Sequence, residues 1–191
     1  MATHDELAQV SGPLERVFFS GAGTALLEEW GRQNGTASRR DRLRGVVRIQ
    51  DEAFLGRLDV LGIRPEACLA IALVPLVLVA WADGSVDERE RKAFLESARR
   101  QGVAAERIAG RALENALSRP PAPQLFDLWA AYVRRLWICF TADEQWRMRK
   151  NLLDAAREVA EATGSFLGLT SGISAAERDT LERIQAVLDQ A

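Results

Sequence analysis

Three carboxylates lie close together in the segment "WADGSVDERERKAF", residues 81–94. Asp83, Asp87 and Glu90 fall within eight residues of one another. Carboxylate oxygens at this density suit a hard cation such as calcium or magnesium. We therefore take these three residues as candidate metal ligands, with Glu177 as a fourth if the second copy of this turn, described below, faces the first.

The spacing of these acids matches only the second half of an EF-hand loop. With Gly84 at the glycine position of such a loop, Asp87 and Glu90 occupy the ninth and twelfth positions. The first and third positions then fall on Val79 and Trp81, whose side chains cannot coordinate a cation. A complete EF-hand is excluded, and a looser site for calcium or magnesium stays open.

A second interpretation of the same residues is that they begin a helix. The segments "DGSVDERERKAF" and "TSGISAAERDTL" share one pattern, in which Asp87 aligns with Ser174 and Glu90 with Glu177. An oxygen-bearing residue followed three places later by glutamate is a capping box, which satisfies the free N–H groups of a helix start. Each such cap contributes about 1 kcal/mol of stability without any ligand.

A cluster of arginines precedes these turns, in the segment "SRRDRLRGVVR". Its members are Arg39, Arg40, Arg42, Arg44 and Arg48. The functional interpretation is a contact surface for an anionic membrane or an acidic partner. The alternative is a solvated helix face whose charge is balanced by acids elsewhere in the chain.

The sequence offers few groups for catalysis. His4 is the only histidine, so a serine–histidine or cysteine–histidine pair lacks a base in the body of the chain. Cys68 and Cys139 lie in apolar runs, which is typical of small buried side chains and not of a metal pair. We predict no enzyme and no required cofactor, and a hydrolase that uses the same acids with a metal is a weaker third hypothesis.

The elements that position these residues all carry helical periodicity, so the sequence predicts an all-α, single-domain bundle of about nine helices. The expected ranges are about 13–33, 38–49, 51–61, 65–82, 88–101, 104–118, 123–140, 142–163 and 175–189. At 191 residues the chain is long enough to bury roughly 70% of its extended surface. We expect residues 1–50 to form a helical arm and residues 51–191 to form the core.

The most apolar segment is "ACLAIALVPLVLVAWA", residues 67–82. It is shorter than the roughly 20 residues that a membrane span needs, so we predict a buried central helix and no transmembrane segment. Pro75 lies near its middle and is expected either to kink this helix or to divide it in two.

The apolar helix with its "ADGSVDERE" turn, followed by the second turn "LTSGISAAERDTL", resembles the TerB-like tellurite-resistance family over about residues 52–190. The resemblance implies an all-helical bacterial domain, a role in stress response and protein–protein interaction, and a cytoplasmic location at or near the inner face of the membrane. It also implies divalent metal binding, with Asp83 and Glu90 in the first motif and Glu177 in the second. Thr170, Ser171 and Ser174 stand where a second acidic site needs acids.

The leading functional hypothesis is a non-enzymatic helical module that binds protein partners, with a divalent cation at residues 83–90 as a modulator. The net charge of −2 and pI near 5.6 give no general attraction to nucleic acid, which we do not expect as a partner. The alternative is a peripheral adaptor that docks on an anionic membrane or acidic partner through the arginine-rich helix, residues 38–49.

Overall fold

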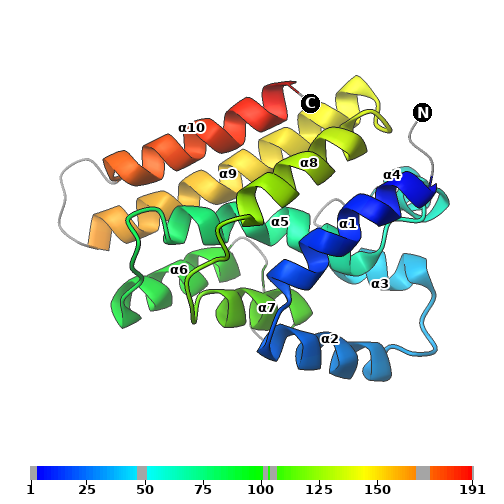
Figure 1. Ribbon diagram of the computed structural model, residues 1–191, viewed down its shortest axis with the longest axis horizontal. Coiled ribbons are helices and arrows are strands. Elements are labelled where there is room, and N and C mark those ends of the chain that lie inside the picture. Colours follow the sequence, from blue (N-terminus) through cyan, green and yellow to red (C-terminus); the bar gives the residue numbers. More distant parts are fainter. Residues whose placement is uncertain (1–3, 47–50, 101–102, 104–106, 167–172, 191) are drawn as a thin grey trace.

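The computed structural model describes residues 4–46, 51–100, 103, 107–166 and 173–190, which form ten α-helices and no strand (Figure 1). The helices are α1 (His4–Phe18), α2 (Ala22–Gln33), α3 (Arg39–Val46), α4 (Glu52–Val60), α5 (Pro65–Ala80), α6 (Glu88–Arg100), α7 (Ile108–Ala116), α8 (Leu125–Trp137), α9 (Ala142–Phe166) and α10 (Ala175–Gln190). The predicted all-α bundle is confirmed.

The number of helices exceeds the expected nine because the segment 13–33 is not one helix. The chain breaks at Gly21, whose φ of +67° is a left-handed conformation that glycine adopts without strain. The side chain of Arg119 donates hydrogen bonds to the carbonyl and hydroxyl oxygens of Ser20 at this break. Pro13 was expected to begin the helix, but α1 begins earlier and contains it.

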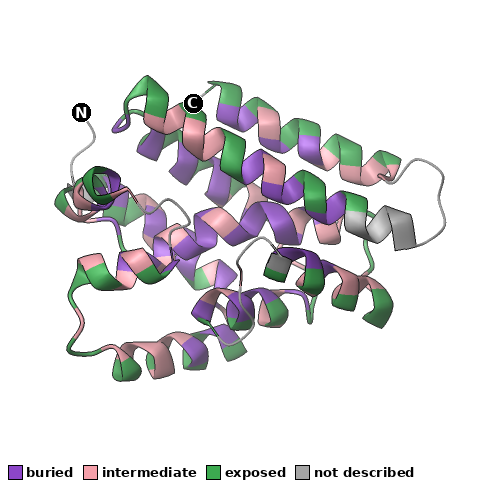
Figure 2. Cartoon of the chain, turned by 180° about the vertical axis from the view of Figure 1, so that it is seen from behind, coloured by how far each residue is buried: buried purple, intermediate pink, exposed green. Residues whose placement is uncertain are grey.

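Helix α5 is the centre of the bundle. It packs against α1, α3, α7, α8, α9 and α10, and most of its residues are buried (Figure 2). A helix that neighbours cover on every side must be apolar all round, which explains why its sequence shows no polar face. The prediction of a buried central helix is confirmed, and α5 continues through Pro75 without dividing.

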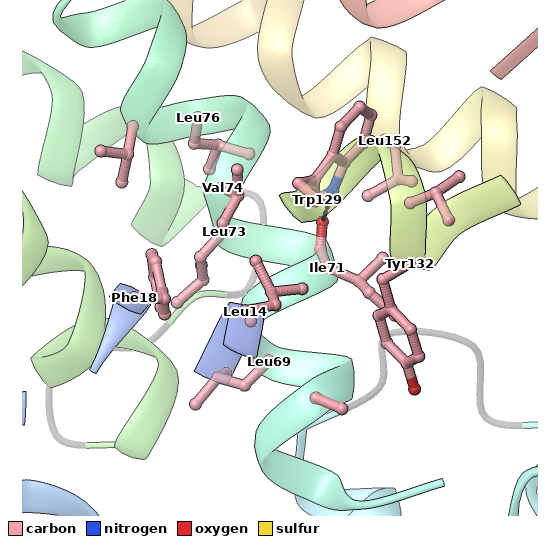
Figure 3. Close-up of a cluster of buried hydrophobic side chains, with 14 of the residues drawn as sticks. Leu14, Phe18, Leu69, Ile71, Leu73, Val74, Leu76, Trp129, Tyr132 and Leu152 are labelled. Atoms are coloured by element: carbon pink, nitrogen blue, oxygen red, sulfur yellow. Dashed lines mark hydrogen bonds between the residues drawn. The ribbon is translucent and has the colours of Figure 1, made fainter. Parts of the chain in front are cut away.

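The proline inside α5 leaves one backbone carbonyl without its helical partner. Pro75 has no N–H group, so it cannot bond to the carbonyl of Ile71 four residues earlier. The indole Nε1–H of Trp129, on α8, donates to that oxygen instead at 3.1 Å (Figure 3). Both residues are buried, so this contact satisfies a polar group that water cannot reach.

The N-terminal helices share the core of the rest of the chain. Leu14 of α1 and Leu43 of α3 are fully buried within the same hydrophobic cluster as α5, and α1 packs against α8 as well as α5. The boundary expected between residues 50 and 51 adjoins residues 47–50, which lie outside the described part of the chain.

Helix α4 ends near its expected position, whereas α9 extends past its own. Gly62, at φ +68°, ends α4, and the N–H of Ile63 bonds to the carbonyl of Leu58 at 2.9 Å. This is a C-terminal cap made by a glycine followed by an apolar residue. Helix α9 runs through Gly164 to Phe166, beyond the expected end at about residue 163.

Over the described ranges, no single helix combines the length and apolar character of a membrane span. Helices α4 and α5 reach that length only as a pair, and they are bent by 113° at the break between them.

Candidate functional site

The acidic turn, residues 81–87, connects α5 to α6. Gly84 takes φ +91°, a conformation that favours glycine and reverses the chain. One carboxylate oxygen of Asp83 accepts a hydrogen bond from the N–H of Ser85 at 3.1 Å. Asp83 therefore holds the turn through a local side-chain-to-backbone bond.

Asp87 and Glu90 form the predicted capping box of α6. Asp87 Oδ1 accepts from the N–H of Arg89 at 2.6 Å and from the N–H of Glu90 at 2.8 Å. Glu90 Oε2 accepts in return from the N–H of Asp87 at 2.8 Å. Both carboxylates satisfy backbone donors at the helix start, as the sequence repeat indicated.

The start of α10 repeats this capping geometry. Glu177 Oε2 accepts from the N–H of Ser174 at 2.7 Å, and the Ser174 hydroxyl accepts from the N–H of Glu177 at 3.1 Å. Ile173 is partly buried against the core beside this cap. The starts of α6 and α10 lie at the same end of the bundle, on the left in Figure 1, and both have the predicted capping-box hydrogen bonds.

Three of the four proposed metal ligands belong to the two caps. Asp87 and Glu90 belong to the α6 cap and Glu177 to the α10 cap, while Asp83 bonds within its own turn. Within the described ranges, no three or more histidine, cysteine, aspartate or glutamate side chains are grouped so that they could hold a metal ion. The caps explain this arrangement, because they direct the carboxylate oxygens at backbone N–H groups.

The arginine-rich helix α3 is already neutralised by carboxylates. Its ion pairs are Arg39 with Asp59 at 3.9 Å, Arg40 with Glu52 at 3.0 Å, Arg42 with Glu66 at 3.9 Å, and Arg44 with Asp41 and Glu52, both at 2.8 Å. Arg48 lies outside the described residues. The four described arginines therefore fasten α3 to α4 and α5, which favours the interpretation of a charge-balanced surface.

Neither cysteine is prepared for thiolate chemistry. Cys139 is buried, and Cys68 is partly buried on α5. Burial, reinforced by the nearby Glu66 and Glu15, raises the pKa of the Cys68 thiol to about 12. At neutral pH this thiol stays protonated and is a poor nucleophile.

The fold creates a mainly apolar cavity between α5 and its neighbours, which the sequence did not predict. The cavity has a volume of about 430 Å³, and residues of α3, α4, α5, α7, α8 and α9 line it. The signal that could have pointed to it is Ala72, a small residue among large ones on the central helix. Such a site depends on the packing of six helices, which periodicity does not specify.

Three large apolar side chains are exposed, and the sequence did not predict that they form a surface. Val60, Ile138 and Trp146 are the exposed large hydrophobic residues of the described chain, at 86%, 64% and 53% exposure. Arg57, one turn before Val60, donates to the carbonyl of Cys139 at 3.3 Å and pairs with Glu144 at 3.4 Å. These contacts hold the end of α4 against the junction of α8 and α9, so we refer to Val60, Ile138 and Trp146 as the apolar corner.

Compared with models of known protein families, with curated proteins and with solved structures, the chain matches none of them.

Proposed function

We propose that this chain is a non-enzymatic helical module that binds protein partners through the apolar corner. The observation that supports this proposal is that the exposed Ile138 and Trp146 lie at the junction of α8 and α9, which the end of α4 that carries Val60 contacts through Arg57. Single exposed apolar residues are ordinary, but a group that includes tryptophan is typical of binding surfaces. The resemblance to TerB-like proteins supports the same class of function, in a bacterial stress response in the cytoplasm or at the inner face of its membrane.

Site-specific photocrosslinking tests this proposal. A photoreactive amino acid would replace Trp146 in the full-length chain, expressed in its bacterial host. The matched control would carry the same amino acid at Glu161, which is also exposed on α9 and lies about 22 Å further along the helix at 1.5 Å per residue. We expect a discrete protein adduct from position 146 and none from position 161.

The identity of the adduct decides between two kinds of partner. An adduct with a different protein, found by mass spectrometry, supports a partner-binding module. An adduct with a second copy of the chain replaces this proposal with self-association. If both positions, or neither, give adducts, the apolar corner is not a specific binding surface.

Cation modulation at the acidic turn belongs to the same proposal. A calcium or magnesium ion near Asp83, Asp87 and Glu90 would have to compete with the capping hydrogen bonds, and would thereby change how α6 leaves the turn. A ligand at one hundred times its dissociation constant adds about 2.7 kcal/mol of stability, which is a rise in Tm of roughly 5 to 10 °C for a chain of this size. If calcium, magnesium and manganese all leave Tm unchanged, the proposed cation modulation is wrong.

A further inference from the structure

The cavity beside α5 is open space among well-packed helices. Its described walls are mainly apolar, with Leu73 and Leu76 of α5 and Leu152 and Ala155 of α9 among them. Protein interiors otherwise pack as densely as organic crystals. A cavity of about 430 Å³ falls in the size range of small-molecule sites, roughly 300 to 1,000 Å³.

Two further observations confirm that this space is accessible. Cys68 and Ala72 lie one turn apart on the central helix and both line the cavity, yet they keep partial exposure while most of α5 is buried. Gly45 also lines the cavity, and a Cβ atom added there would meet nothing within 4 Å. The cavity therefore communicates with solvent near Gly45.

The polar groups that line the cavity are mostly cationic. They include Arg44, Arg107 and Asn151, and all three are at least partly exposed. Arg44 is held in position by Glu52 at 2.8 Å, whereas Arg107 forms no ion pair with any described residue. Among the described residues, Arg107 is thus a positive charge without an ion-pair partner at the edge of this space.

The N-terminus of α7 adds to this positive potential. Arg107 is its N-cap residue, and its side chain makes no capping hydrogen bond. Ala109, in the first turn of α7, lines the cavity. The first N–H groups of a helix carry partial positive charge and favour an anion.

We propose that the cavity binds an amphipathic monoanion of the fatty-acid class. The hydrocarbon chain would lie along α5 and α9, and the carboxylate would accept hydrogen bonds from Arg107 and Asn151 at the entrance. An engineered cavity of about 150 Å³ holds one benzene molecule. By that ratio this cavity accommodates roughly 17 non-hydrogen atoms, which is sufficient for dodecanoate.

Other ligand classes fit the lining less well. A divalent cation would find no carboxylate, because no aspartate or glutamate is among the described lining residues. A nucleotide would bury a polar base and sugar against leucine side chains without partners, which is costly. The protonated thiol of Cys68 gives no covalent attachment, so the binding is non-covalent and reversible.

Isothermal titration of the full-length chain with dodecanoate, below its micelle-forming concentration, tests the proposal. Dodecanol serves as the neutral probe of the same chain length, and vesicles of phosphatidylglycerol test whether acyl chains within a membrane are bound instead. Three variants accompany the wild type. Arg107→Gln removes the free charge, Ala72→Leu fills the cavity, and Arg111→Gln is the matched control on α7, outside the described lining.

We expect dodecanoate to bind the wild type at least tenfold more tightly than dodecanol, since a hydrogen bond to a charged group has about that effect. Arg107→Gln should weaken dodecanoate about tenfold and leave dodecanol unchanged, whereas Arg111→Gln should change neither. Ala72→Leu should abolish binding of both. If that variant does not fold, Ala109→Leu fills the cavity from α7 and should give the same loss.

Three results would overturn the proposal. If dodecanoate does not bind, or if it still binds a folded cavity-filling variant, the cavity is not the binding site. Equal affinity for dodecanol and dodecanoate would show that the protein does not recognise the anionic head group. Binding to vesicles without binding to free dodecanoate replaces the fatty acid with a membrane. None of these results bears on the apolar corner, so the proposed function stands or falls separately.

Discussion

The hydrogen bond between Trp129 and the central helix supports a quantitative prediction. Trp129→Phe removes the indole N–H and leaves the carbonyl of Ile71 without a donor, because Pro75 supplies none. An unsatisfied buried polar group costs about 1 to 3 kcal/mol. The smaller ring also leaves a cavity, so the total loss of unfolding free energy should exceed that range.

A double-mutant cycle separates the two contributions. Pro75→Ala restores a backbone N–H four residues after Ile71, and this group can bond to the same carbonyl along the helix. In the Pro75→Ala background, Trp129→Phe should lower the free energy of unfolding only by the contribution of the cavity. The coupling energy between positions 75 and 129 should therefore be about 1 to 3 kcal/mol.

The measurement is urea unfolding of the four proteins, with the free energy extrapolated to water. Trp137→Phe is the matched control, because Trp137 is also buried on α8 but does not bond to Ile71. That variant should be additive with Pro75→Ala to within about 0.5 kcal/mol. A coupling energy for Trp129 that is equally small would show that the indole is only a packing group and that our account of the proline is wrong.

Three other predictions concern the caps, a buried acid and a thiol. Asp87→Ala and Ser174→Ala should each lower the unfolding free energy by about 1 kcal/mol and Tm by roughly 2 to 4 °C. Asp87→Ser keeps a capping oxygen and should stay near the wild type. A serine variant as unstable as the alanine variant would contradict the capping role. Burial raises the pKa of Glu15 although the guanidinium of Arg64 lies 2.7 Å away and lowers it. The folded chain therefore keeps a proton that the unfolded chain has lost, and the unfolding free energy should fall as pH rises from the ordinary carboxyl pKa through the raised value. Glu15→Gln should flatten that decline in urea unfolding across about pH 4 to 8, and an unchanged slope would assign the decline to another group. Cys68 should react with iodoacetamide at pH 8 far more slowly than a free thiol, given its pKa of about 12, and a rate like that of free cysteine would refute its protonated state.

Local rules account for the parts of the fold that the sequence predicted correctly. A capping box needs only two residues three positions apart, so Asp87 with Glu90 and Ser174 with Glu177 could be paired from the sequence, and both pairs form the predicted bonds. The Gly62–Ile63 stop and the burial of α5 follow from equally local patterns. The patterns that predict these features lie within short stretches of sequence, although the burial of α5 itself comes from packing against distant helices.

Most of the features that the sequence did not predict depend on contacts between distant residues. Pro13 is a favoured first residue of a helix, but packing against α8 extends α1 past it. Arg44 looked available for a partner, and only the arrangement of α3 against α4 shows that Glu52 neutralises it. The carboxylates at 83–90 looked like a ligand set because their spacing suits a metal and a cap equally well, and coordinates were needed to show which donors they face.

The C-terminal helix α10 has a consequence for how the chain is made. It covers α5, α8 and α9, and four of its apolar residues are buried there: Leu181, Ile184, Val187 and Leu188. Since α5 ends at Ala80 and α10 begins at Ala175, a ribosome adds about 95 residues between them, which takes roughly 5 to 19 s at 5 to 20 residues per second. During that interval the side of the hydrophobic helix α5 that α10 covers is exposed to solvent. Nascent chains should therefore be most prone to aggregation, and most dependent on chaperones, just before α10 emerges.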